Sequence, residues 1–323
     1  MLYPLKFSPI LKDKIWGGTK LKSLFDKAAQ TDKLGESWEL SGYEGDESVV
    51  TNGFLAGNNL TELIEIYMGE LIGDNIYDEY GLSFPLLFKL IDANENLSIQ
   101  VHPNDEVAAE RHNSFGKTEM WYVVDADPGA VLIIGFSEDC SRETYLEAME
   151  EDKVEDLLQK VPVTKGDVFF IPAGRVHAIG KGVVVAEIQQ SSDITYRIYD
   201  YKRKDDNGNE RELHTEQALD VIDFGASKQP KTNYSSLLNE TTPLVTCDYF
   251  TTNMLRFDKR LERQYAKIDS FVAYMCLEGD FTIEFEGDKT IVSKGDTVLI
   301  PASIDELSLI PDGKVTLLEV YVP

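Results

Sequence analysis

The chain has few basic residues, few cysteines and no long apolar run. Its 31 lysines and arginines stand against 57 acidic residues, which gives a formal net charge of −26. A surface of this charge repels nucleic-acid phosphates and anionic lipid, so nucleic acid and membranes are not expected as partners. Any phosphorylated ligand would need a local basic pocket.

The three cysteines, at positions 140, 247 and 276, are far apart and show no Cys-x-x-Cys spacing. This usage predicts buried thiols in a reducing compartment. The N-terminal stretch Met1–Pro9 has no apolar core of signal-peptide length, and no later run approaches the length of a membrane span. We therefore expect a cytoplasmic location.

The remaining composition is ordinary, with 42% hydrophobic residues in 323, enough for two domains or three small ones. Apolar residues at helical spacing predict helical segments around 58–80 and 141–160. A short helix is expected from His214, with Thr215 as a candidate cap, and the charged segment 202–211 is expected to be a turn or loop. Alternating or continuous apolar runs predict strands at 38–41, 86–91, 97–102, 120–124, 130–134, 167–171 and 183–189.

An internal repeat divides the chain. The segment Val163–Ala173 is echoed by Val292–Ala302, in both cases with a Lys-Gly-Asp turn, an apolar strand and Ile-Pro-Ala. The echo predicts a second β domain of the same type. Apolar periodicity is lost near 227–236, so we expect one domain over 1–226 and another over 237–323.

The second copy differs from the first where it matters for chemistry. Ser303 and Glu306 stand where the first copy has Gly174 and His177, and the strand segment 271–285 holds no histidine. The C-terminal domain is therefore predicted to lack metal ligands and to serve a structural or oligomerising role.

Two segments of the N-terminal half predict a metal site. Gln100 and His102 lie two apart in a predicted strand, so their side chains leave the same face. Glu119 opens the next predicted strand, and His177 begins a strand after a turn. Imidazole, carboxylate and amide oxygen together suit one Zn²⁺ per chain, with a coordination position left open. A single strand histidine is more often a core or surface residue, so the prediction depends on the set.

The second segment resembles a known signature. From Gly166 the order Gly, five residues, Pro, one residue, Gly, two residues, His is similar to the second half of the cupin signature. Lys181 replaces the asparagine that usually closes it. The resemblance implies a jelly-roll β fold around the metal site.

Further motifs follow one another in order along residues 4–214. They are Pro9–Gly18, Gly35–Ser41, Leu87–Ile91, Leu97–Pro103, Gly116–Trp121 and Ser191–Arg197. Together they resemble type I mannose-6-phosphate isomerase in its shorter bacterial form. The resemblance implies a mainly β fold of two cupin-like jelly-roll domains, with a helical insertion packed on the N-terminal one. Longer relatives carry a large helical insertion between the last two ligands, where only 57 residues separate Glu119 from His177 here.

The resemblance implies a zinc-dependent aldose–ketose isomerase that interconverts mannose 6-phosphate and fructose 6-phosphate through a cis-enediol. It implies that Arg197 is catalytic and that Ser98 and Lys89 contact the substrate phosphate. Strand alternation adds Lys117 and Glu187 as candidate proton carriers, with the choice between them open. The expected partner is a small sugar phosphate, and the expected state is a monomer or homodimer.

Other roles and functions remain open on the sequence. Ser98 shares a strand face with the ligand pair, whereas Lys89 lies in an apolar strand and should need an anionic partner. A non-catalytic sugar-phosphate-binding cupin is the main alternative. An Fe²⁺ cupin oxygenase is a weaker one, because it would normally use a third histidine where this chain has Gln100. Trp16 and Trp38 could wall the pocket or belong to the core.

Overall fold

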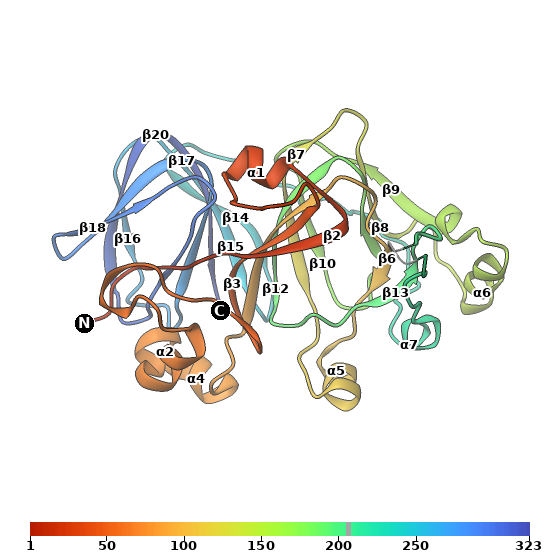
Figure 1. Cartoon of the computed structure of the whole chain (residues 1–323), viewed down its shortest axis with the longest axis horizontal. Coiled ribbons are helices and arrows are strands. Elements are labelled where there is room, and N and C mark those ends of the chain that lie inside the picture. The colour runs from red at the N-terminus through yellow and green to blue at the C-terminus, as the bar shows by residue number, and fades with distance from the viewer. Residues whose placement is uncertain (205–207) are drawn as a thin grey trace.

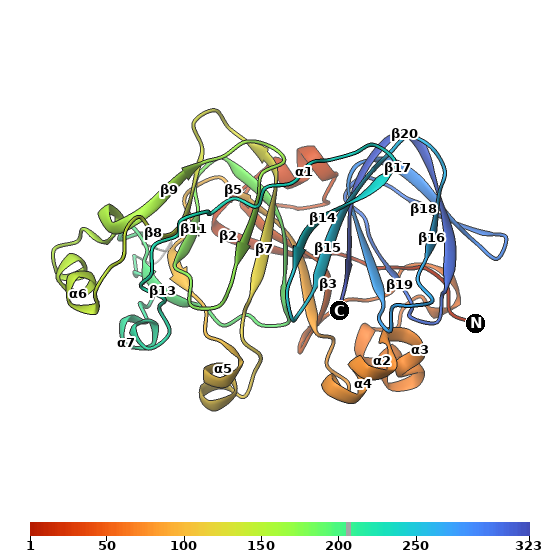
Figure 2. The same ribbon diagram turned by 180° about the vertical axis from the view of Figure 1, so that it is seen from behind.

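Two barrel-shaped β units lie side by side in the computed structural model, with the helices at their margins (Figures 1 and 2). The structure describes residues 1–204 and 208–323. Residues 205–207, part of the predicted loop 202–211, lie outside the described residues. The mainly β fold class expected from the sequence is confirmed.

The N-terminal barrel consists of two sheets. The seven-stranded sheet has the order β10-β7-β12-β5-β3-β2, with β4 on β3, and the five-stranded sheet has the order β13-β6-β11-β8-β9. The first comprises β2 Ile10–Gly18, β3 Leu34–Tyr43, β4 Asp46–Glu47, β5 Leu86–Ala93, β7 Glu119–Ala126, β10 Val168–Ile171 and β12 Val183–Gln190. The second comprises β6 Ile99–Val101, β8 Val131–Phe136, β9 Leu158–Pro162, β11 His177–Ile179 and β13 Tyr196–Tyr199.

The C-terminal barrel is one eight-stranded sheet of order β1-β19-β17-β20-β15-β14, with β16 on β20 and β18 on β17. Its first strand comes from the N-terminus of the chain, because Leu5 pairs with Leu299. Its strands are β1 Leu5–Lys6, β14 Glu240–Thr246, β15 Thr251–Phe257, β16 Leu261–Gln264, β17 Val272–Phe285, β18 Asp288–Val292, β19 Thr297–Ile300 and β20 Glu306–Tyr321.

The central seven-stranded sheet buries both faces. Along β5 and β12, Phe88, Leu90 and Ile188 join a core shared with the C-terminal barrel, whereas Ile91 and Val185 join the interior of the N-terminal barrel. Every residue of both strands is buried. This double burial explains why the two strands read as near-continuous apolar runs rather than as alternating ones.

The predicted helical segment 58–80 is three short helices, α2 Leu60–Tyr67, α3 Gly69–Ile72 and α4 Asp74–Tyr80. Met68 and Gly73 break it with φ of 46° and 104°. A Cβ on Gly73 would lie 2.4 Å from the Asp269 carbonyl oxygen, and the Asp269 carboxylate accepts hydrogen bonds from the first two amides of α4. The segment therefore also binds the C-terminal barrel, beyond the expected packing on the N-terminal one.

The helix predicted over 141–160 is shorter than expected. It runs as α6 Arg142–Glu150, followed by a 3₁₀ turn at Val154–Leu157, and Leu158 begins β9. Leu158 and Val161 of β9 are buried in two different core clusters. Because β9 pairs with β8, sheet pairing overrides the helical spacing there. The remaining helices are α1 Lys20–Phe25, α5 Asp105–His112 and α7 Thr215–Leu219.

One smaller expectation changes: His214, not Thr215, is the N-cap of α7, and it makes no side-chain cap bond. His112 ends α5, and its Nε2 lies 2.8 Å from the Tyr196 hydroxyl. No helix in the described parts of the chain is long and apolar enough to cross a membrane.

A buried ion pair joins the two barrels. The Lys27 ammonium lies 2.7 Å from a Glu39 oxygen on β3 and donates a second bond of 2.8 Å to the carbonyl of Gly295, in the turn before β19. Both side chains are less than a tenth exposed. Burial raises the pKa of Glu39, and the lysine charge opposes that rise. Removing one charge would leave the other buried without a partner.

We expect Lys27→Met to lower the free energy of unfolding by about 3–5 kcal/mol, because it strands the Glu39 carboxylate. Adding Glu39→Gln should recover most of the loss. Urea denaturation followed by circular dichroism measures both variants. A double variant less stable than the single one would contradict this account of the interface.

Candidate metal centre and adjoining cavity

The four predicted metal ligands meet between the two sheets of the N-terminal barrel. Gln100 on β6 pairs directly with His177, the first residue of β11. His102 follows β6, and Glu119 opens β7, facing them from the seven-stranded sheet. The two-residue spacing does place Gln100 and His102 toward the same site. One antiparallel strand pairing and the packing of two sheets therefore bring together ligands that are far apart in the sequence.

Their donor atoms lie close together. The Nε2 atoms of His102 and His177 are 3.1 Å apart. Glu119 Oε1 lies 3.3 Å from His177 Nε2, and Oε2 lies 3.5 Å from His102 Nε2. All three side chains are almost wholly buried. They are also the one histidine–carboxylate group within the described residues that has the spacing of a metal site.

Backbone carbonyls decide which imidazole nitrogens are free. His102 Nδ1 donates to the Ile194 oxygen, and His177 Nδ1 donates to the Arg175 oxygen, each over 2.8 Å. A carbonyl can only accept, so each Nδ1 carries the proton. The two Nε2 lone pairs therefore face each other. This is the arrangement in which an outer hydrogen bond orients a metal-binding imidazole.

The site also holds a cluster of buried acceptors whose pKa values are shifted by their surroundings. Burial, the largest influence, lowers the pKa of His177 to about 3 and holds that of His102 well below its ordinary value. Burial, and then the Glu187 charge, raise the pKa of Glu119 to about 8. Neither oxygen of Glu119 has a hydrogen-bond partner among the described residues. Buried acceptors of this kind need a cation or a proton.

Gln100 completes the set. Its Nε2 lies 3.3 Å from His177 Nε2, and its Oε1 accepts a long 3.5 Å bond from the Ser98 hydroxyl. A half-turn of the terminal amide exchanges these two atoms and points an oxygen at the imidazoles. Two imidazole nitrogens, a carboxylate and an amide oxygen then fit a borderline divalent cation.

A cavity of about 240 Å³ adjoins the donor cluster. Charged side chains dominate its wall, and the two sheets supply them from opposite sides. Of the candidate residues from the sequence, Lys89, Ser98, Gln100, Lys117, Glu187 and Arg197 all line it. Its other lining residues are Lys14, Trp16, Glu36, Ile91, Leu97, Trp121, Ile179, Asp193, Thr195 and Arg211.

The buried ammonium of Lys89 has the anionic partners expected from its apolar strand. Its Nζ lies 3.5 Å from Glu187 Oε1 and 4.9 Å from the centre of the Trp38 ring. Burial opposes its charge, but Glu187 and then Glu36 outweigh that effect and raise its pKa above the ordinary value. Lys89 therefore stays charged. Trp16 lines the cavity, whereas Trp38 is buried behind it.

Two further cavity residues flank the donor cluster. The Lys117 ammonium lies 3.5 Å from Glu119 Oε2. Glu187 accepts a 2.7 Å hydrogen bond from Trp121 Nε1, which fixes one of its oxygens, whereas its Oε1 has no hydrogen-bond partner within the described residues. Lys117 lies just before β7, and Glu187 lies on β12, which pairs with β7, so a cation and an anion both flank the site.

Comparison with known proteins agrees with this geometry. The model for "Phosphomannose isomerase type I, catalytic domain" matches residues 4–133, and that for "Mannose-6-phosphate isomerase, cupin domain" matches residues 239–322. The mannose-6-phosphate isomerase ManA of Bacillus subtilis is 37% identical over 95% of each chain. The chain belongs to the type I phosphomannose isomerase family. The family resemblance noted from the sequence is confirmed.

Other members of the phosphomannose isomerase family support the assignment. The mannose-6-phosphate isomerase of Streptococcus mutans is 39% identical over 88% of this chain and 89% of its own. A crystal structure of the Bacillus subtilis mannose 6-phosphate isomerase superposes with a TM-score of 0.87, at 32% identity and 99% coverage of both chains. A putative mannosephosphate isomerase of Archaeoglobus fulgidus shares the fold, with a TM-score of 0.78 at 23% identity.

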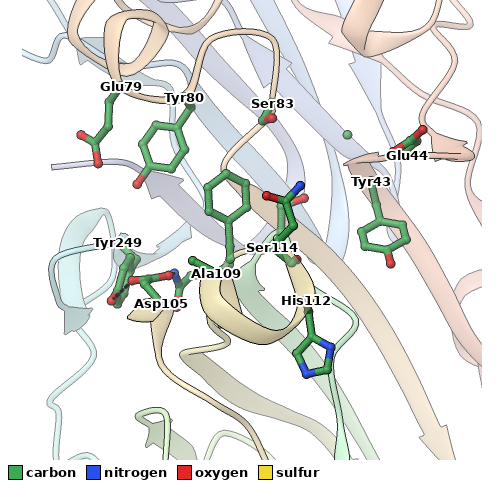
Figure 3. A pocket seen from close by; sticks show the side chains of 15 residues that line it. Tyr43, Glu44, Glu79, Tyr80, Ser83, Asp105, Ala109, His112, Ser114 and Tyr249 are labelled. Atoms are coloured by element: carbon green, nitrogen blue, oxygen red, sulfur yellow. Dashed lines mark hydrogen bonds between the residues drawn. The ribbon is translucent and has the colours of Figure 1, made fainter. Parts of the chain in front are cut away.

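A larger hollow, of about 820 Å³, lies apart from the donor cluster in this family member. Figure 3 shows Tyr80, Tyr249 and His112 around it, and Tyr249 donates a 2.5 Å bond to Asp105. None of the predicted metal, catalytic or phosphate residues lines this hollow. Size alone would therefore not have singled out the cavity that adjoins the donor cluster.

The polar cavity residues Lys14, Glu36, Thr195 and Arg211 were not among the candidates from the sequence. Lys14, Glu36 and Thr195 fall inside strings that resemble the family, so their positions could have been examined. Lys14 forms a 3.2 Å ion pair with Glu36. Arg211 ends the charged segment 202–211, and no periodicity or spacing connects it with the site. Only the folded chain brings it there.

Metal binding should release a proton. At pH 7 the Glu119 carboxyl is largely protonated, whereas His102 and His177 are neutral, so a bound cation should displace close to one proton and none from the imidazoles. Titrating chelator-treated protein with Zn²⁺ by calorimetry, in buffers of different ionisation enthalpy, counts these protons. The Glu119→Gln variant is the control, and it should release none. Release of two protons by the unmodified protein would contradict the neutral state assigned to the two imidazoles.

Proposed function

We propose that the protein is a zinc-dependent aldose–ketose isomerase that interconverts mannose 6-phosphate and fructose 6-phosphate. The observation that carries the proposal is a buried donor set of two imidazoles, a carboxylate and an amide, opening into a cavity lined by Lys117, Glu187 and Arg197. The family assignment and the names of its relatives support the same reaction.

In this proposal Gln100, His102, Glu119 and His177 hold one Zn²⁺. The ion would supply an electrophile for the sugar oxygens. Because both imidazoles and the Gln100 amide are neutral, Glu119 is the one negatively charged member of this donor set. The two sheets exclude bulk water from the donor cluster. Gln100 in place of a third histidine distinguishes this set from that of an iron oxygenase.

Proton transfer between C1 and C2 needs a group that can take a proton and return it. Glu187 meets the requirement on one side, because Trp121 holds one oxygen and leaves the other without a hydrogen bond. Lys117 meets it on the other, adjacent to the donor cluster. Both line the cavity and both remain candidates, since each could transfer the proton within one face of a cis-enediol.

In this proposal Arg197 stabilises negative charge on the enediolate. It lies on β13 directly opposite Gln100, beside the donor cluster. Its Nη1 donates to the Glu212 carbonyl over 2.8 Å, and its buried Nε has no partner within the described residues. A guanidinium held on one side and free on the other can receive an oxyanion without reorganising.

The substrate phosphate would bind toward Ser98 and Lys89. Ser98 precedes β6, so its hydroxyl lies on the same side as Gln100 and at the end away from His102. Lys89 adds a permanent positive charge to the cavity wall. A hexose 6-phosphate carries its phosphate and its reacting carbons at opposite ends, which matches this separation along the strand.

Incubating zinc-loaded protein with mannose 6-phosphate in D₂O should yield fructose 6-phosphate that carries deuterium at the transferred position, seen by NMR. A proton carrier that exchanges with solvent produces this label. Binding of mannose 6-phosphate without turnover would instead favour a sugar-phosphate-binding cupin. Oxygen consumption by iron-loaded protein would favour the oxygenase.

Variants should separate metal binding from stabilisation of the enediolate charge. We expect His177→Ala to lose metal and turnover together, whereas Arg197→Ala should keep stoichiometric zinc and lose about 10²–10³-fold in kcat. Atomic absorption gives the metal content, and the isomerase assay gives kcat. Equal metal loss in both variants would remove the assigned division of roles.

Lys117→Met and Glu187→Gln distinguish the two candidate proton carriers. The variant that removes the carrier should lose about 10²–10⁴-fold in kcat together with the deuterium wash-in, whereas the other should retain exchange. Lys12, which lies over the outer ring of Trp38 and outside the cavity, offers a matched lysine control as Lys12→Met. Retained exchange in both variants would exclude both residues.

A further inference from the structure

Three charged side chains form a cluster at the β13 end of the cavity. Asp200, only 5% exposed in its side chain, accepts two hydrogen bonds from Arg211, at 2.7 Å from Nε and 2.5 Å from Nη2. It also accepts a bond from Arg203. The bidentate contact fixes the Arg211 guanidinium in orientation, because both of its bonds lie in one plane.

Arg211 and Arg203 differ in which guanidinium nitrogens lack a hydrogen bond. Arg211 lines the cavity, and its third nitrogen, Nη1, makes no hydrogen bond to the described residues. Arg203 does not line the cavity; its Nη1 donates to the carbonyl of Asn96, and its buried Nε has no hydrogen-bond partner among the described residues. One aspartate therefore holds two arginines, of which one presents a donor to the cavity.

Arg211 is also close to a second cavity cation. Burial is the largest influence that lowers the pKa of Arg197, and the charge of Arg211 is the next. Two guanidinium groups that repel each other across a cavity wall are a suitable environment for an anion, because a bound anion relieves both the desolvation and the repulsion.

The pairing of β13 with β6 indicates where Arg211 lies relative to the predicted metal ligands. Tyr199 pairs with Ile99, so Asp200 continues β13 toward Ser98. The donor cluster lies the other way along β6, with His102 four residues from Ser98, which is about 13 Å at 3.3 Å per strand residue. Arg211 is thus held at the end of the cavity that lies away from the metal ligands.

Carboxylates already compensate the charge of Lys89, so a second residue is needed to bind the substrate phosphate. The Lys89 charge is compensated by Glu187 and Glu36. A phosphate dianion bound to Lys89 alone would therefore meet two carboxylates as well. Arg211 has only Asp200 as a carboxylate partner among the described residues, and Arg203 shares that carboxylate.

We infer that Arg211 binds the phosphate group of the substrate, as a specificity-determining residue that Asp200 orients. The inference rests on the proposed function for the identity of the substrate, and it concerns a residue that neither the sequence motifs nor the cupin metal site contains. It accounts for selective binding of a dianion by a chain of net charge −26. Inorganic phosphate should compete for the same position.

Arg211→Gln tests the inference against Arg203→Gln, which removes the same charge from the same aspartate without touching the cavity. For Arg211→Gln we expect the KM for mannose 6-phosphate and the inhibition constant of inorganic phosphate to rise about tenfold to hundredfold. Its kcat at saturation and its zinc content should stay within about threefold of the parent. Arg203→Gln should leave all four quantities near the parent values.

Unchanged KM and phosphate inhibition in Arg211→Gln would overturn the inference, as would equal rises in both variants, which would mean a structural effect of the Asp200 cluster. If Arg211→Gln does not fold, Arg211→Lys decides, since a rise of at least threefold in the phosphate constant supports the role and no rise overturns it. Calorimetric binding of inorganic phosphate to parent and variants needs no turnover. It therefore separates failure of this inference from failure of the isomerase proposal.

Discussion

The seven-stranded sheet has to bury both of its faces, one against the C-terminal barrel and one against the five-stranded sheet. Alternation along β5 and β12 then sends Phe88 and Ile188 into the shared core and turns Lys89 and Glu187 inward. Charges in such a place must compensate one another, because neither face reaches bulk water. The polar lining of the cavity is thus a consequence of the sheet's position. The same sheet carries Glu119, so the metal centre depends on it as well.

The C-terminal barrel has other residues at the positions that correspond to the candidate metal centre and its cavity. Ile171 pairs with Glu119 in the first barrel, and the matching Ile300 pairs with Val272 in the second. By that register Tyr274 corresponds to Trp121 and Glu319 to Glu187, since each pair is again cross-strand. In the second barrel Arg263 binds Glu319 at 2.6 Å, and Tyr265 donates to the same carboxylate. In the second barrel an arginine of the chain itself thus pairs with the glutamate that corresponds to Glu187.

The local pattern predicted the strands well and the helices less well. Each predicted strand is present, because β-branched and aromatic runs bounded by turns have few other ways to pack. The helical segments are where long-range contacts intervene. Asp269, nearly two hundred residues away, accepts the first amides of α4 and sets the break at Gly73. Pairing with β8 converts Leu158 from helix to strand. Neither contact can be predicted from the residues within ten positions of the segment that it changes.

For the candidate site, the sequence by itself determined the ligand types. Gln100 and His102 share a strand face because side chains alternate, and the Pro172-Ala173-Gly174 turn before His177 follows from backbone conformations that few other residues adopt. The residue types also favour a borderline divalent cation. Tertiary structure alone decided that Glu119 meets the histidines, that Ile194 and Arg175 fix their tautomers, and that Arg211 reaches the cavity. These depend on two sheets packing face to face and on a carboxylate, Asp200, that orients a distant arginine. Periodicity along one segment carries no information about such contacts.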